Sequence, residues 1–206
     1  EVPAQNTCLE DKQMKKLIAF LLAGVMLLSL AACAAKTEDT NPPASEEDTI
    51  ADALTLLNSV WASYSEDEKF PAAGGDYSEE NMTDGAPGKV GLDDPSSVEY
   101  LLSIPAADVE KADDAASLTH MMNGNTFTCG ALRRKDAGEL ETTAKDVKDY
   151  IMAKQWMCGF PDKLVVAGVG SYLIEVYGAE DLVNTFRDKL QEVYPQTTIL
   201  SDDPIA

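Results

Sequence analysis

The feature that most constrains this chain is an apolar run close to its N-terminus. The run extends from Leu17 to Leu30, directly follows a pair of lysines, and ends in small residues before Cys33. With 14 residues, it is shorter than the roughly 20 residues that a permanent membrane-spanning helix requires. A cationic start, a short apolar run and small residues are typical of a secretory signal. We therefore expect this segment to be removed rather than to join the fold.

The end of the signal, Leu30-Ala31-Ala32-Cys33, resembles the lipobox of bacterial lipoproteins. The resemblance implies that Cys33 receives a diacylglyceryl group and becomes the mature N-terminus. We therefore expect Met14 to be the true start and residues 1–13 to be a misassigned upstream segment. Residues 14–32 are then the signal peptide, and the polar, Pro-containing residues 33–46 are a flexible tether. The expected location is the outer face of the cytoplasmic membrane, in a Gram-positive bacterium.

The charge of the chain restricts its partners. Its formal net charge is −20, and removing residues 1–32 leaves this value unchanged, because that segment holds three acids and three bases. So acidic a chain is repelled by phosphate backbones and by anionic lipid headgroups. We therefore expect no nucleic-acid partner, and membrane association through the lipid on Cys33 alone. No cofactor is expected.

Two cysteines, Cys129 and Cys158, remain in the mature chain once Cys33 carries the lipid. An even number of cysteines in an exported protein allows one disulfide. The alternative is two separate thiols that pack as small hydrophobic side chains. The sequence leaves both possibilities open.

Apolar periodicity predicts a single α+β domain over residues 47–206. A helix is expected at about 47–64, followed by a long irregular loop over 65–93. Asp94 is the expected N-cap of a short helix that starts at Pro95 and ends near Ser103. Strands are expected at 117–122, 126–133, 163–167 and 172–177, helices at 138–154 and 179–193, and a further edge strand at 197–200.

The two halves of the C-terminal part resemble each other in sequence, which suggests an internal repeat. Leu140 matches Leu182 at an offset of 42, and Leu118 matches Leu164 at an offset of 46. The matches indicate two ββα repeats, 117–154 and 163–194. They predict an antiparallel four-stranded sheet with helices on one face, in ββαββα order, preceded by one or two helices.

A candidate binding surface is formed by four residues of this domain, His120, Met122, Trp156 and Phe160. His120 is the only histidine, and it is either a structural side chain or a functional one. The connection from Trp156 to Pro161 is rich in aromatic residues, and such a connection either lines a pocket or closes the edge of the core. Neither a metal-ligand spacing nor a nucleophile–base pair is recognisable, so no metal site and no enzymatic activity are expected.

Two segments, 119–130 and 155–164, resemble a family of small lipoproteins from Gram-positive gut anaerobes, some of which are labelled "bile acid transporter". The resemblance extends over most of residues 47–206. The mature chain has no apolar stretch long enough to cross a bilayer, so we do not expect it to translocate a solute by itself. The expected function is an extracytoplasmic binding or accessory module for an unknown small molecule. The alternative is a structural or protein-interaction component of the cell envelope.

Overall fold

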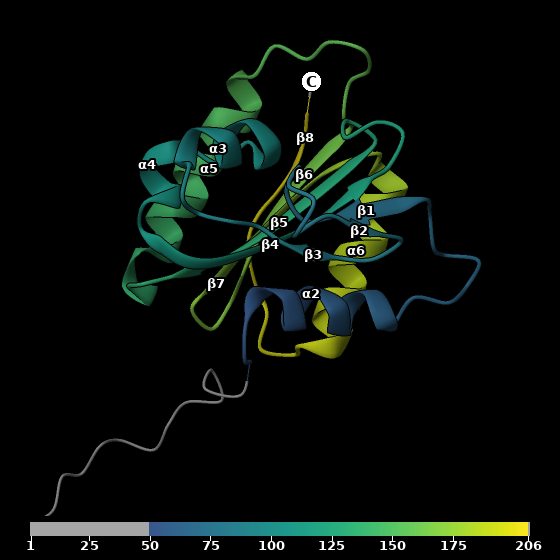
Figure 1. Ribbon diagram of the computed structural model, residues 1–206, viewed down its shortest axis with the longest axis horizontal. Coiled ribbons are helices and arrows are strands. Elements are labelled where there is room, and N and C mark those ends of the chain that lie inside the picture. Colours follow the sequence, from purple (N-terminus) through teal and green to yellow (C-terminus); the bar gives the residue numbers. More distant parts are fainter. Residues whose placement is uncertain (1–49, 206) are drawn as a thin grey trace, which may run out of the picture. The chain divides into compact units, whose positions relative to one another are not determined.

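An antiparallel sheet forms the centre of the computed structural model of this protein (Figure 1). The structure describes residues 50–205. Residues 1–13, the signal peptide, Cys33 and the tether lie outside the described residues. All the elements described below belong to one compact unit, Ala44–Ala206.

Groups of helices and groups of strands follow one another along the chain. The helices are α2 (Ala53–Ala62), α3 (Pro95–Leu102), α4 (Ala106–Val109), the 3₁₀-helix η2 (Ala137–Glu139), α5 (Leu140–Ala153) and α6 (Glu180–Val193). The strands are β1 (Ala72–Gly74), β2 (Thr83–Asp84), β3 (Gly88–Lys89), β4 (Ala112–His120), β5 (Phe127–Arg134), β6 (Lys163–Val169), β7 (Tyr172–Gly178) and β8 (Thr198–Pro204).

The sheet has the strand order β2-β1-β4-β5-β7-β6-β8, and β3 also pairs with β4. All of these pairings are antiparallel. The prediction of an α+β fold with an antiparallel sheet is therefore confirmed, but the sheet contains eight strands and not four. Three of the additional strands, β1 to β3, are only two or three residues long and lie in the segment expected to be an irregular loop.

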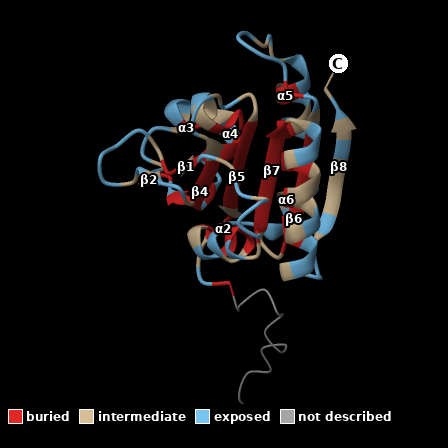
Figure 2. Cartoon of the chain, turned by 90° about the vertical axis from the view of Figure 1, so that its right-hand side faces the viewer, coloured by how far each residue is buried: buried red, intermediate tan, exposed pale blue. Residues whose placement is uncertain are grey.

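Helices cover both faces of the sheet, so the prediction of helices on one face is wrong (Figures 1 and 2). On one face α2 and α6 pack against Phe127, Cys129 and Ile174. On the other, α3, α4 and α5 pack against Leu132, Leu164 and Leu173. The physical reason is visible in β7, in which every residue is buried. A strand that is apolar at nearly every position needs cover on both sides.

The matched halves of the C-terminal part differ in which face they use. Leu118 belongs to the core under α2 and α6, whereas its counterpart Leu164 belongs to the core under α3, α4 and α5. Leu140 on α5 and Leu182 on α6 likewise pack against different cores. The two ββα segments therefore place equivalent side chains on opposite sides of the sheet.

Local signals at the helix starts agree with the structure. The Asp94 carboxylate accepts hydrogen bonds from the backbone N–H groups of Ser96 at 3.1 Å and Ser97 at 3.4 Å. Pro95 occupies the first helical position, where its missing N–H has no cost. The first helix starts later than expected, because Asp52 caps α2 by accepting from the Thr55 N–H at 2.6 Å.

The segment from β1 to β3 is fixed to the sheet by very close backbone contacts. A Cβ at Gly74 would lie 2.2 Å from the backbone nitrogen of Gly88, so only glycine fits there. The Ser117 hydroxyl on β4 accepts from the Gly75 N–H at 2.8 Å and donates to the Gly75 carbonyl at 2.7 Å. These contacts hold the start of the 75–82 loop, which lines the hollows described next.

Candidate functional site

Three adjoining hollows form a groove on the surface of the domain. Their volumes are about 440, 360 and 330 Å³, each within or near the range of ligand-binding pockets. Tyr77 and Leu101 line all three. We call them the α3 hollow, the hairpin hollow and the Lys154 hollow, after the element or residue that distinguishes each, and together they make up the groove.

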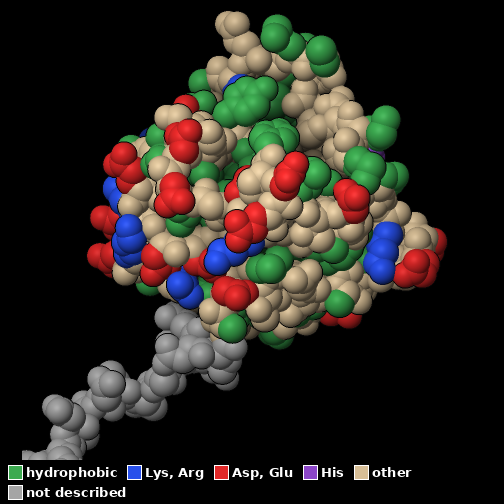
Figure 3. Space-filling view, viewed as in Figure 1, with side chains coloured by type: hydrophobic (Ala, Val, Ile, Leu, Met, Phe, Trp, Pro, Cys, Tyr) green, Lys and Arg blue, Asp and Glu red, His purple; other side chains and the backbone are tan. Residues whose placement is uncertain are grey.

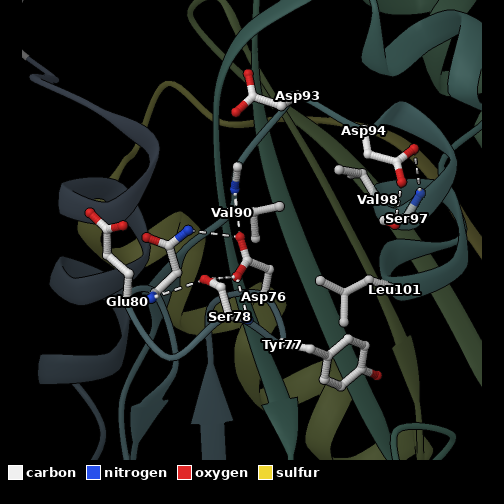
Figure 4. A pocket seen from close by; sticks show the side chains of 12 residues that line it. Asp76, Tyr77, Ser78, Glu80, Val90, Asp93, Asp94, Ser97, Val98 and Leu101 are labelled. Atoms are coloured by element: carbon white, nitrogen blue, oxygen red, sulfur yellow. Dashed lines mark hydrogen bonds between the residues drawn. The ribbon is translucent and has the colours of Figure 1, made fainter.

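The α3 hollow lies between the 76–81 loop and the first turn of α3, and Figure 4 shows it from close by. Asp76 organises its loop: its carboxylate accepts from the Ser78 N–H at 2.8 Å, the Asn81 Nδ2 at 2.7 Å and the Gly91 N–H at 2.9 Å. Partial burial raises the pKa of Asp76, but the hydrogen bonds from Ser78, Gly91 and Asn81 outweigh burial and lower the pKa to about 2. Asp76 therefore shapes the wall of the groove.

The hairpin hollow includes two residues of the predicted binding surface, His120 and Met122. His120 ends β4, and its ring stacks against Phe70 with centroids 5.7 Å apart. Its Nδ1 accepts from the Met122 N–H at 3.3 Å. The Met122 side chain is exposed. His120 thus has packing and hydrogen-bond partners of its own beside the groove.

The Lys154 hollow includes Trp156 together with Tyr77, Tyr100, Leu101, Met157 and Tyr177. Trp156 packs on Tyr177 with ring centroids 5.2 Å apart, and the Lys154 amine lies 4.9 Å from the Trp156 ring centroid. Trp156 is only partly buried, so it contributes both to the core under α5 and to the wall of the hollow. Phe160 is highly exposed and does not line any of the three hollows.

Side-chain amides join the connection after α5 to the turn between β4 and β5. Asn123 Nδ2 donates to the Cys158 carbonyl at 3.0 Å, and Asn125 Nδ2 donates to the Met157 carbonyl at 2.9 Å and the Gly159 carbonyl at 3.0 Å. Both Cys158 and Gly159 have positive φ angles, 63° and 123°. The bonds bring His120, Met122 and Trp156 to the same groove, although they come from separate connections.

A polar cluster lies behind the Lys154 hollow. Lys154 Nζ donates to Ser103 Oγ at 2.5 Å, and Ser103 Oγ lies 3.2 Å from the Tyr177 hydroxyl. Ser103 is fully buried and adopts a left-handed conformation with φ 60° as the C-cap of α3. Burial lowers the pKa of Lys154, and burial together with the neighbouring Glu175 raises the pKa of Tyr177 to about 12.

Glu175 is the most unusual residue of this cluster. It lies on β7 with no exposed surface, and neither of its carboxyl oxygens has a hydrogen-bond partner among the described residues. Burial raises the pKa of Glu175 far above its ordinary value, and the charge of Lys154 only partly opposes that effect. The position therefore disfavours the charged form of the carboxyl.

The sequence analysis did not select Lys154, Ser103 or Glu175. A signal for Glu175 was available, because it is the only acid in the otherwise apolar run of β6 and β7. Lys154 and Ser103 end two different helices 51 residues apart in sequence, and no sequence spacing predicts their contact. Their proximity results from the packing of α3 and α5 on one face of the sheet.

The two cysteines are free thiols in the structure. Cys129 is buried in the core under α2 and α6, whereas Cys158 is exposed. The disulfide that the sequence left open is therefore not formed. Burial, and secondarily the charge of Glu175, raise the pKa of Cys129, which makes it an unreactive core residue.

Within residues 50–205, no group of three or more His, Cys, Asp and Glu side chains is placed to hold a metal ion. The helices of the same residues include none that is both long and apolar enough to cross a membrane. Comparison with protein families finds no match, and comparisons with curated proteins and with solved structures find no significant match either.

Proposed function

We propose that this protein is a lipid-anchored extracytoplasmic binding module whose ligand site is the groove around Tyr77 and Leu101. The observation that carries the proposal is that three hollows of ligand-binding size share these two side chains. Exposed aromatic side chains at such a place are characteristic of binding surfaces, because they offer large apolar contact area. Tyr77 and Tyr100 are 77 % and 78 % exposed.

The lipid anchor is proposed from the sequence, through the lipobox at Cys33. The described chain begins beside α2, and the connection after α5 lies at the opposite end of the domain (Figures 1 and 2). A domain tethered through its α2 end presents the Trp156 end of the groove away from the tether. This arrangement suits a module that receives a ligand from outside the cell or passes it to an envelope partner.

An uncharged fluorescent probe, N-phenyl-1-naphthylamine, tests the groove. We expect it to bind residues 44–206, the unit that contains both cores, with increased fluorescence. Replacing Tyr77 with Ala removes a wall shared by all three hollows and should weaken binding at least fivefold. Phe160→Ala is the matched control, because Phe160 is equally exposed but lies outside the hollows. Equal losses for the two variants, or no binding to the unsubstituted protein, would contradict the proposal.

A second candidate function, a protein-interaction component of the envelope, is favoured by one observation. Four exposed large apolar side chains, Met121, Met122, Met157 and Phe160, lie on the two connections that Asn123 and Asn125 hold together. We call them the apolar tip. Figure 3 shows hydrophobic side chains gathered at this end of the molecule, with most charged side chains elsewhere on the same face. Methionine-rich surfaces adapt to varied protein partners.

The two candidates differ in which residues they require. If the apolar tip carries the function, Phe160→Ser, at the one tip residue that lines none of the three hollows, should reduce co-sedimentation with purified Gram-positive envelope severalfold and leave the naphthylamine probe unaffected. If the groove carries it, Tyr77→Ala should reduce probe binding and Phe160→Ser should co-sediment like the unsubstituted protein.

A further inference from the structure

Lys154 places a cationic group in an otherwise uncharged hollow. It is the C-cap of α5, and it is the only charged residue among those that line the Lys154 hollow. Its amine lies against the Trp156 ring and donates one hydrogen bond, to the neutral Ser103 hydroxyl. An ammonium group has three donors, so two are left for a ligand in the hollow.

The charge of Lys154 has no ionised partner close to it. Among the described residues, no carboxylate forms a salt bridge with its amine. Twelve salt bridges, with distances of 2.5 to 3.8 Å, involve most of the other basic residues described. Glu175 is the one acid whose charge acts on the Lys154 pKa. Neither carboxyl oxygen of Glu175 forms a hydrogen bond or a salt bridge with the amine among the described residues, and burial disfavours the charged form of this carboxyl. A partly desolvated, uncompensated cation is stabilised by any anion that reaches it.

We propose that the Lys154 hollow binds the anionic head of an amphipathic ligand, with Lys154 as the charge-recognising residue and the aromatic groove as the site for the apolar body. This inference rests on the proposed function of the groove and adds the chemical class of its ligand. The head is a carboxylate, sulfonate or similar oxyanion. The body lies along Tyr100 within this hollow and along Tyr77 and Leu101, which also line the two neighbouring hollows.

The net charge of −20 does not prevent anion binding at this position. Exposed charges act over roughly a Debye length, which is about 8 Å at physiological ionic strength. Asp76, Glu80, Asp93 and Asp94 line the α3 hollow, Asp76 and Asp84 line the hairpin hollow, and no acid lines the Lys154 hollow. Two hollows of the groove are thus acidic and the third is cationic. That asymmetry orients an amphipathic anion with its head at Lys154.

A matched pair of probes tests the inference without any substitution. 1-Anilinonaphthalene-8-sulfonate and N-phenyl-1-naphthylamine share an apolar body and differ in the sulfonate. We expect the sulfonate probe to bind residues 44–206 about tenfold more tightly, as one charge-assisted hydrogen bond allows. Equal affinities, or tighter binding of the uncharged probe, would overturn the inference and leave the groove itself supported.

Substitution then assigns the effect to one side chain. Lys154→Met should reduce affinity for the sulfonate probe about tenfold and leave the uncharged probe within twofold, whereas Lys154→Arg should retain both. The control is Lys145→Met, because Lys145 lies on the same helix and pairs with Asp149 at 2.5 Å, away from the hollow. A sulfonate preference that survives Lys154→Met, or that Lys145→Met also removes, would refute the role of Lys154.

Glu175→Gln tests whether the ammonium is uncompensated. We expect this variant to bind the sulfonate probe within twofold of the unsubstituted protein at pH 7, because Glu175 forms no salt bridge with Lys154 and burial disfavours the charged form of its carboxyl. A large gain in affinity would show that an ionised Glu175 had been neutralising Lys154, and would contradict the inference. If neither probe binds the unsubstituted protein, the proposed function of the groove is itself contradicted, and not only the role of Lys154.

Discussion

Gly130 on β5 faces Glu175 on β7, and the space that holds the buried carboxyl exists because residue 130 has no side chain. A Cβ at Gly130 would lie 2.6 Å from Glu175 Oε1 and 2.9 Å from a methyl carbon of Leu102. The two residues are direct partners in the sheet. A glycine in the middle of a central strand thus accommodates an acid on its neighbour, and α3 closes over both.

We predict that Gly130→Ala destabilises the domain by about 1–3 kcal/mol, because the new methyl group must displace the Glu175 carboxyl or Leu102 in a packed core. Urea denaturation measures the change. Glu175→Ala creates room for the methyl group, so the double variant should lose less than the sum of the two single variants. Additive losses would show that the methyl group does not compete with the carboxyl for space.

Glu175→Gln should stabilise the domain at neutral pH and have progressively less effect as the pH falls. The pKa of Glu175 is raised in the folded protein. As the pH rises, Glu175 therefore ionises in the unfolded chain, near its ordinary pKa of 4.5, before it ionises in the folded protein. The stability of the unsubstituted protein therefore decreases as pH rises from about 4.5 toward the folded-state pKa. Urea denaturation at pH 4, 5.5 and 7 should show an advantage for the Gln variant that grows with pH. A constant difference would contradict the prediction.

Asp76→Asn should show the opposite dependence on pH. The pKa of Asp76 is lowered to about 2, so its stabilising effect is present at neutral pH and disappears as pH falls from about 4 to 2. Because Asp76 is only partly buried, we expect a loss of roughly 1 kcal/mol at pH 7 and nearly none at pH 2. Thermal unfolding at both values provides the measurement, with Asp84→Asn as the control on β2. Similar losses at both pH values would assign Asp76 a role independent of its charge.

Thiol titration of residues 44–206 should distinguish the two cysteines. We expect one fast-reacting thiol in the folded protein, from exposed Cys158, and a second only after denaturation, from buried Cys129. Cys158→Ser should remove the fast phase and leave the slow one. A protein that shows no thiol after denaturation without reductant would contain a disulfide, contrary to the structure.

The test of lipidation at Cys33 requires expression of the full chain in a Gram-positive host. Cys33→Ser should abolish incorporation of labelled fatty acid and move the protein from the membrane fraction to the medium. Cys158→Ser provides the control, because its thiol is also exposed but follows no lipobox. Membrane retention of the Cys33→Ser protein would rule out the lipid as the anchor.

The fold was predictable wherever the signal was local. Asp94 and Pro95 placed the start of α3, and the apolar runs of β6 and β7 located the central hairpin. The short strands β1 to β3 were not predictable, because they depend on contacts such as that between Gly74 and Gly88 rather than on apolar alternation. The candidate site was predicted in part: His120, Met122 and Trp156 border the groove, whereas Phe160 lies outside it.

The sequence by itself determined the longer helices and strands and the antiparallel character of the sheet, and it predicts lipidation at Cys33. The amino-acid sequence is enough for these features, because helix caps, strand alternation and signal peptides are each defined by neighbouring residues in the chain. Only the tertiary structure decided that helices cover both faces, and that the ends of α3 and α5 meet so that Lys154 reaches Ser103 beside Glu175. The burial of Glu175 and the contact of the Lys154 amine with Ser103 arise from packing between distant segments.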